Sequence, residues 1–211
     1  MQQNDGSTWA IKIQWACSEL LWMMRLNLLW IGFTLAGGLI LGLGPATVAA
    51  YALARRHATG ESIQTAEFWA VYRGEFGRGS LLVLPAVALI TVLTGDYLYF
   101  SALGPGATAP RLVTLAALLS AVIVAAYLLP MYVHYDLRPS ACLAKAPLFA
   151  LAHPAASILL LFAFAVDVQT IKTLPVLAPI LGVGVWIQFD TWLCLRFFAE
   201  NEARLDSKGD P

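Results

Sequence analysis

The chain has 211 residues, of which 59% are hydrophobic and 12% are charged, and its formal net charge is +0. An average soluble domain carries about 25% charged residues, so a soluble globule of this composition would have too little polar surface to cover itself. The balanced charge provides no basic field for nucleic acid, and we expect no nucleic-acid partner. The composition predicts one small domain that has membrane lipid as its solvent.

The first 21 residues are mixed in polarity. The stretch AIKIQWA before Cys17 is partly polar, unlike the apolar core of a cleavable signal peptide or a lipoprotein signal. We therefore expect residues 1–21 to be a retained interfacial segment. The three cysteines, Cys17, Cys142 and Cys194, form no CxxC pair, so no zinc or redox site is predicted, and a disulfide is left open.

Five mostly apolar windows are long enough to cross a bilayer, which takes about 20 residues. They cover residues 22–43, 80–103, 112–135, 153–171 and 173–198. Asp167 interrupts the fourth window, so the fourth and fifth could instead form a re-entrant hairpin. The sequence predicts an all-α, polytopic helical membrane protein with five transmembrane helices in one membrane domain, residues 22–199. Residues 200–211 are expected to be a polar cytoplasmic tail.

The distribution of Lys and Arg predicts the orientation, because cytoplasmic loops are enriched in these residues. Nine fall on one side of the five expected spans: Arg55, Arg56, Arg73, Arg78, Arg138, Lys145, Arg196, Arg204 and Lys208. Four fall on the other: Lys12, Arg25, Arg111 and Lys172. We expect the N-terminus outside and the C-terminus in the cytoplasm.

A 29-residue stretch without charge, residues 26–54, is too long for one crossing and too short for two. Gly42 and Gly44 are expected to loosen the end of the first span, and Pro45 suits the first position of a new helix. Residues 45–59 therefore predict an interfacial helix on the cytoplasmic face. Arg55 and Arg56 lie in its last turn, where cations favour the helix dipole.

A second interfacial helix is predicted over residues 66–78. Phe68, Tyr72 and Phe76 fall at helical spacing and form an aromatic stripe, with Trp69 and Arg73 beside it. The stripe either packs on the protein's own spans or contacts lipid. Together with the preceding helix it gives a candidate partner- or lipid-binding surface: Arg55, Arg56, Phe68, Trp69, Tyr72, Arg73 and Phe76.

Three polar residues at membrane depth are functional candidates, because such groups are costly in lipid. Arg25 either snorkels to the interface, forms a structural pair or contacts a substrate, and Asn27 is expected to hydrogen-bond a neighbouring helix. Asp190 is the best candidate for a proton or cation site. Its alternatives are a hydrogen bond to a facing helix or a pair with Arg196.

The remaining titratable residues predict no catalytic centre. His134 and Asp136 are two residues apart, so on a helix they point to different sides and chelate one metal poorly. His153 is expected to mark the start of the fourth span. The chain lacks HExxH, Walker A, Rossmann and G-x-S-x-G motifs, so we expect no metal, no cofactor and no enzymatic activity.

Several short motifs appear in a characteristic order. They are MRLNLLW (24–30), GLGPATVAAYALARR (42–56), EFWAVYRGEF (67–76), HYDL (134–137) and ALAHP (150–154). In this order they resemble the YesL-like family of bacterial integral membrane proteins. The residues that carry the resemblance most clearly are Gly44, Pro45, His134, Asp136, His153 and Pro154.

The resemblance implies an association with uptake systems for complex carbohydrates, notably binding-protein-dependent ABC transporters, and carries no agreed catalytic residues. The leading hypothesis is a non-catalytic membrane protein accessory to such a system, bound to its permease or binding protein. The alternative is a small transporter or channel subunit that uses Asp190, for which a homo-oligomer is left open. A third hypothesis is a membrane-embedded enzyme built on His134, Asp136 and His153, which requires these groups to converge.

Overall fold

The computed structural model describes residues 5–135 and 138–209, with side chains described for residues 9–135 and 138–200. All regular elements in these ranges are helical. In chain order they are α1 (Asp5–Ala36), α2 (Ile40–Ala58), α3 (Thr65–Gly74), α4 (Phe76–Ala102), η1 (Pro105–Ala107), α5 (Thr108–Tyr135), α6 (Pro139–Ala152), α7 (Pro154–Thr173), η2 (Pro175–Leu177), η3 (Ala178–Gly182) and α8 (Val183–Gly209). The all-α prediction is confirmed.

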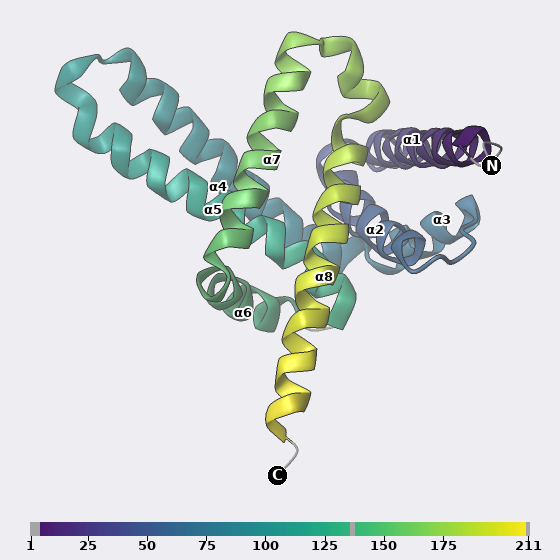
Figure 1. Ribbon diagram of the computed structural model, residues 1–211. Helices are drawn as coiled ribbons and strands as arrows, with labels where there is room; N and C mark the ends of the chain where they lie inside the picture. Colours follow the sequence, from purple (N-terminus) through teal and green to yellow (C-terminus); the bar gives the residue numbers. More distant parts are fainter. Residues whose placement is uncertain (1–4, 136–137, 210–211) are drawn as a thin grey trace.

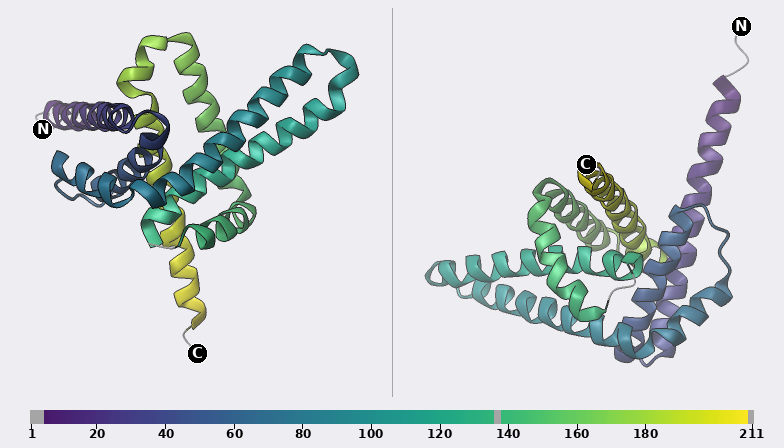
Figure 2. Two further views of the ribbon diagram at one scale, coloured as in Figure 1. Left: turned by 180° about the vertical axis from the view of Figure 1, so that it is seen from behind. Right: turned by 90° about the horizontal axis from the view of Figure 1, so that it is seen from below.

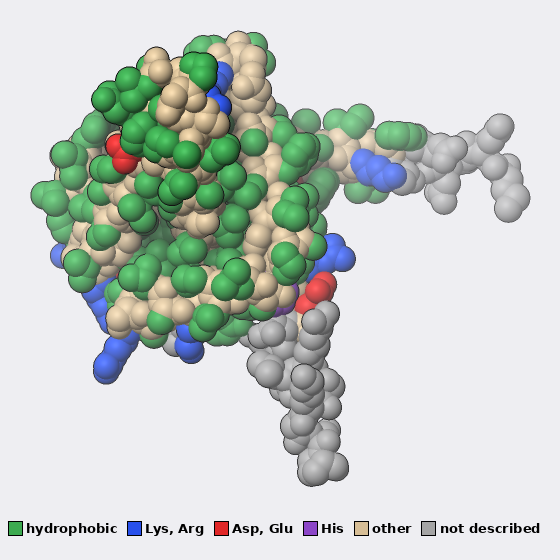
Figure 3. Space-filling model, turned by 90° about the vertical axis from the view of Figure 1, so that its left-hand side faces the viewer, with side chains coloured by type: hydrophobic (Ala, Val, Ile, Leu, Met, Phe, Trp, Pro, Cys, Tyr) green, Lys and Arg blue, Asp and Glu red, His purple; other side chains and the backbone are tan. Residues whose placement is uncertain are grey.

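Four helices in the described part of the chain are long and apolar enough to cross a membrane. They are Phe76–Ala102, Pro105–Tyr135, Pro154–Thr173 and Pro175–Glu200. They match the last four expected spans, and they form two hairpins, α4–α5 and α7–α8, whose tips point to the same side of the molecule (Figure 1). The face in Figure 3 is covered mainly by apolar side chains, with Lys and Arg mostly along its lower edge. The protein is a helical membrane protein.

The first expected span, residues 22–43, is wrong in its bounds. Helix α1 ends at Ala36, and the chain turns through Gly38 (φ 77°) and Leu39 (φ 65°) before α2 begins at Ile40. Glycine allows this left-handed turn, and a Cβ on Gly37 would overlap the backbone of Gly42. Helix α1 is not among the candidate spanning helices and runs across the direction of α8 rather than along it (Figures 1 and 2).

The expected interfacial helix over residues 45–59 is instead the central helix α2. Helix α2 contacts α1, α3, α4, α5 and α8. Four of its alanines are buried, because small side chains let neighbouring helices approach from several sides: Ala46, Ala49, Ala50 and Ala54. Tyr51 is buried among them. A surface position is therefore wrong for this segment.

Pro45 lies inside α2 and not at its first position. A proline there cannot donate to the carbonyl four residues earlier, that of Leu41. The Ser80 hydroxyl of α4 lies 3.2 Å from the Leu41 carbonyl oxygen and 2.6 Å from the Phe76 carbonyl oxygen, so it can donate to either. A neighbouring helix thus solvates the carbonyl that Pro45 leaves unpaired.

The second expected interfacial helix, residues 66–78, is shorter than predicted. Helix α3 ends at Gly74, and Gly77 and Arg78 already belong to the first turn of α4. Helix α6 was not predicted, because Pro139 and Pro147 make this stretch read as a loop. Pro139 occupies its first turn, where a missing N–H does no harm.

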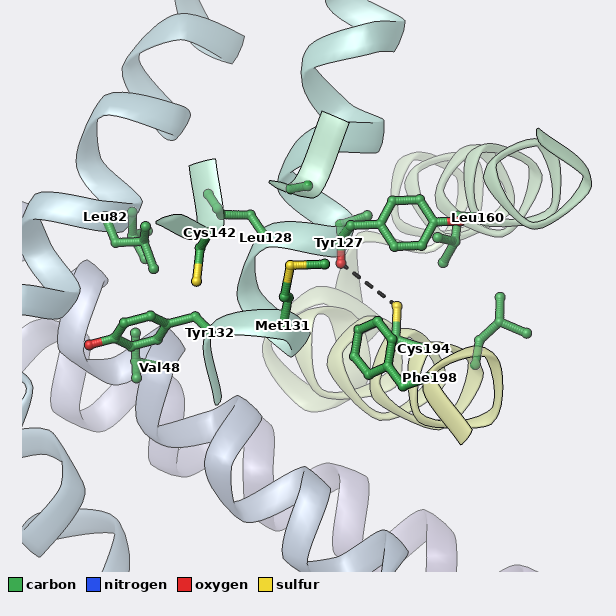
Figure 4. Packing of buried hydrophobic residues seen from close by; sticks show 14 of the residues in the cluster. Val48, Leu82, Tyr127, Leu128, Met131, Tyr132, Cys142, Leu160, Cys194 and Phe198 are labelled. Carbon is green, nitrogen blue, oxygen red and sulfur yellow. Dashed lines mark hydrogen bonds between the residues drawn. The ribbon is translucent and has the colours of Figure 1, made fainter. Parts of the chain in front are cut away.

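The core divides into two clusters that meet along α2 and α8. One packs α2, α4, α5, α6, α7 and α8 around Tyr127, Met131, Cys194 and Phe198 (Figure 4). The other packs α1, α2 and α3 around Leu26, Tyr51 and Phe68, with Ile187 of α8. The outer halves of α4 and α5 contribute little to either cluster.

The contact between α2 and α4 depends on Gly44, because a Cβ there would overlap the backbone of Gly79 and Ser80. We expect Gly44→Ala to lower the free energy of unfolding in detergent by about 1–3 kcal/mol through overpacking. Gly95→Ala in α4 is the matched control, since a Cβ at Gly95 meets nothing within 4 Å. It should be neutral or up to about 1 kcal/mol stabilising. Equal effects of the two changes would contradict the close packing.

Candidate functional site

A layer of buried polar side chains lies where α1 and α2 cross α8. Gln188, Asp190 and Thr191 of α8 and Asn27 of α1 are each at most 9% exposed. Buried polar groups cost free energy unless they are hydrogen-bonded, so their partners determine how these three helices fit together.

Asp190 is fully buried and receives a 2.6 Å hydrogen bond from the Tyr51 hydroxyl of α2. The Cys194 thiol lies 3.6 Å from its other oxygen. Among residues with described side chains, no Lys, Arg or His forms an ion pair with Asp190. The expected hydrogen bond to a facing helix is confirmed. The alternative pair with Arg196 is wrong, because Arg196 lies beside Glu200 (4.0 Å) and over the Trp192 ring.

Asn27 joins α1 to the irregular start of α8. Its Nδ2 donates to the carbonyls of Ala178 (3.3 Å) and Pro179 (2.8 Å), and its Oδ1 accepts the Gly184 N–H (3.1 Å). Ala178 and Pro179 belong to η3, a π-helical turn whose hydrogen bonds span five residues, and Gly184 follows it in α8. Gly184 lets α1 come this close, because a Cβ there would overlap the Met23 carbonyl. The expected interhelical hydrogen bond of Asn27 is confirmed.

A second polar chain begins at Trp22 of α1. The Trp22 indole N–H donates to Gln188 Oε1 (3.0 Å), and its ring stacks on His57 at 4.3 Å. His57 Nε2 lies 3.2 Å from both carboxylate oxygens of Glu19. Three residues of this series of contacts, Glu19, His57 and Gln188, line a cleft of about 860 Å³ between α1, the end of α2 and α8. Its polar lining includes Glu19, His57, Glu61 and Gln188.

Arg25 does not face lipid at the far end of a first span. Its guanidinium lies 3.4 Å from the Ile63 carbonyl, in the segment that joins α2 to α3, and donates to Oγ1 of Thr65, the first residue of α3 (2.9 Å). The sequence predicted Arg25 on one side of the membrane and the region that follows Arg56 on the other. Because Arg25 contacts this region directly, that separation is wrong. Of the three alternatives for Arg25, the structural one matches its contacts.

The arginine pair at the end of α2 also binds inside the protein. Arg55 donates to the Val133 carbonyl (3.0 Å), and Arg56 pairs with Glu61 and Glu67, each at 2.7 Å. The hydrogen bond from Arg56 lowers the pKa of the Glu61 carboxyl. Both arginines therefore have partners within the protein, and the Arg56 side chain is 37% exposed.

The aromatic stripe divides into a buried and an exposed half. The ring centroids of Phe68 and Tyr72 lie 4.8 and 5.2 Å from the ring centroid of Phe33 in α1. This half of the stripe therefore packs on the protein itself. Trp69 and Phe76 are 47% and 40% exposed. Arg73 lies over the Trp69 ring at 5.5 Å and is also exposed.

The two histidines of the family motifs lie around one aromatic cluster. His134 contacts Phe198 (5.3 Å), Phe198 contacts Phe149 (5.3 Å), and Phe149 stacks on His153 (4.4 Å). Asp136 lies outside the described residues, and Pro154 is the first residue of α7. Within the described ranges no group of three or more His, Cys, Asp or Glu is arranged to hold a metal.

Sequence reasoning missed Tyr51, Trp22, Gln188, Glu19 and His57. Gln188 is a polar residue within an apolar segment, and this contrast was a usable signal. Tyr51 and Trp22 carried none, because an aromatic residue in an apolar helix is usual and only the fold brings each to its partner.

We expect Asn27→Leu to lower the free energy of unfolding in detergent by about 1–3 kcal/mol, since it leaves the buried Gly184 N–H without the acceptor it has here. Thr34→Val on the same helix is the control. The Thr34 hydroxyl is buried with no hydrogen-bond partner, so its loss should be neutral or stabilising. Thermal unfolding of both variants tests this, and a neutral Asn27→Leu would contradict the role of the amide.

The chain has clear relatives. The family described as Protein of unknown function, DUF624, matches residues 23–97, which span the second half of α1, all of α2 and α3, and most of α4. The chain is 31% identical over 196 residues to the uncharacterized protein YesV of Bacillus subtilis (strain 168), covering 92% of this chain and 94% of YesV.

Two other proteins of the same organism also match. They are the uncharacterized proteins YteU, 33% identical over 125 residues (54% of each chain), and YesL, 28% identical over 144 residues (66% of this chain and 68% of YesL). No solved structure matches significantly. As its motifs indicated, the chain belongs to the YesL-like DUF624 family.

Proposed function

We propose that this protein is a non-catalytic subunit of the bacterial cell (inner) membrane that attaches to a carbohydrate ABC uptake system, on its permease or its binding protein. The partner class rests on the family resemblance. The observation that supports docking is the exposed half of the aromatic stripe: Trp69, Arg73 and Phe76, named here the α3 patch.

The α3 patch has the chemistry of a protein interface. Aromatic residues and arginine supply most binding energy at such interfaces when they are presented on a rigid support. Trp69 and Arg73 stand on α3, whose opposite face is fixed by Phe68 and Tyr72, 0% and 4% exposed, and Phe76 is the first residue of α4. The cation over the Trp69 ring also limits its motion before a partner arrives. The α3 patch replaces Arg55 and Arg56 as the proposed docking site.

We further propose that the end of the molecule where α5, α6 and α8 terminate faces the cytoplasm. Arg138, Lys145 and Arg196 lie toward this end, whereas Arg111 and Lys172 lie near the hairpin tips (Figure 1). This distribution follows the positive-inside rule. The outside position of the N-terminus relied on a first span that the structure divides, and it stays a prediction.

Co-purification in mild detergent, with in-cell cross-linking and mass spectrometry, tests the docking proposal. The double change Trp69→Ala with Arg73→Glu should lower recovery of the ABC partner about tenfold or more, as loss of an interface hot spot does. Lys145→Glu, at an exposed position of α6, is the control and should leave recovery of the ABC partner unchanged. Equal recovery with all variants, or recovery of the protein alone, would exclude this function.

A second candidate, a small transporter or channel subunit, is favoured by Asp190. This carboxyl group lies at membrane depth, and Tyr51 is its strong hydrogen-bond partner. Four candidate spans are few for a monomeric carrier, so transport would require a homo-oligomer. In liposomes, Asp190→Asn should abolish solute or ion flux, whereas Asp96→Asn, at an exposed position, should preserve it. Absence of flux in the unchanged protein would exclude transport.

A further inference from the structure

The cleft between α1, the end of α2 and α8 combines an apolar wall with a polar end. Trp15, Phe189 and Trp192 contribute large rings, and Trp15 and Trp192 are 65% and 50% exposed. Phe189 and Trp192 belong to the candidate spanning helix Pro175–Glu200, so this wall lies at membrane depth. The volume of about 860 Å³ is within the range of pockets that hold small amphiphilic molecules.

The polar end of the cleft holds one carboxylate that has no arginine or lysine partner among the side chains that the structure describes. The Glu19 carboxylate has His57 as its neighbour at 3.2 Å, whereas Glu61 is paired with Arg56 at 2.7 Å. Gln188 uses its carboxamide oxygen to accept from Trp22, which leaves the amide NH₂ group for other partners. A carboxylate accepts several hydrogen bonds at once, so Glu19 retains capacity for a cationic donor.

A basic residue stands further out on the same face of α1. Lys12 precedes Glu19 by seven residues, two helical turns or about 10 Å along the axis, so both side chains project from one side. The Lys12 ammonium lies over the Trp9 ring at 5.3 Å, outside the cleft lining, and its flexible stem would turn from that ring to meet a bound phosphate. This face of α1 therefore carries Glu19, which can bind a cation, in the cleft and Lys12, which can bind an anion, farther from it.

We propose that the cleft binds a zwitterionic membrane phospholipid with a primary ammonium group, phosphatidylethanolamine. The ammonium donates to Glu19 at the polar end, the phosphate faces Lys12, and an acyl chain lies along Phe189 and Trp192. The Glu19 carboxylate near the headgroup disfavours an anionic lipid that lacks an ammonium group. A primary ammonium is favoured over a quaternary one because only the former has N–H donors for Glu19.

The test is native mass spectrometry of the full-length, delipidated protein in detergent, titrated with phosphatidylethanolamine, phosphatidylcholine and phosphatidylglycerol of identical acyl chains. Phosphatidylethanolamine should bind about tenfold or more tightly than either other lipid, the cost of one lost charge-assisted hydrogen bond. Glu19→Gln should remove this preference. Glu200→Gln, an exposed carboxylate beside Arg196, is the control and should preserve it.

Because Glu19→Gln also alters the contact with His57, a second variant separates binding from folding. Trp15 lines the cleft and is 65% exposed, so Trp15→Ala should weaken phosphatidylethanolamine binding while leaving thermal unfolding unchanged. Equal binding of the three lipids would overturn the proposal in favour of non-specific lipid. Tighter phosphatidylcholine binding would indicate an aromatic cation site, and tighter phosphatidylglycerol binding an anion site; either overturns it.

The lipid site lies apart from the α3 patch. The double change Trp69→Ala with Arg73→Glu should therefore leave lipid binding unchanged, and Glu19→Gln should leave partner recovery unchanged. The two proposals can fail independently.

Discussion

The close approach of other helices to α2 is the constraint on which the rest of the structure depends. Lipid-facing helices gain little from hydrophobic association, so packing between them relies on small residues and interhelical hydrogen bonds. Helix α2 supplies Gly44 and a series of alanines, and contacts five other helices. Its position lets α1 and α3 assemble on one side while the two long hairpins extend on the other (Figure 2).

The polar layer gives this packing a unique register. Asn27 can satisfy the turn at the start of α8 in only one position along α1, and Tyr51 can reach Asp190 in only one rotation of α2. Leaving either group unpaired in a low-dielectric surrounding is costly, so sliding of the helices is strongly opposed. The same logic explains Ser80, which supports the carbonyl that Pro45 leaves without a donor.

The sequence predicted the four long apolar helices well, because bilayer thickness sets a length that hydropathy measures directly. It failed between residues 26 and 54, where Gly37, Gly38, Gly42 and Gly44 are all credible places for a break. Only the contact of Gly37 with Gly42 across the turn decides between them, and this contact exists only in the folded hairpin. The partners of Arg25 and Arg55 were equally unreadable, since Thr65 and Val133 are 40 and 78 residues away.

A charged residue in an apolar sequence predicts a partner, but it does not indicate whether that partner is internal. Arg55 and Arg56 looked like surface groups because they end an apolar helix, yet Arg55 binds α5 and Arg56 binds the α2–α3 connection and α3. The groups that the fold holds in place and leaves open to a further partner are the α3 patch and the Glu19 end of the cleft. Both lie on the α1–α3 unit, whereas the hairpins meet lipid along most of their length. We infer that the hairpins anchor this unit at the membrane and that recognition takes place on it.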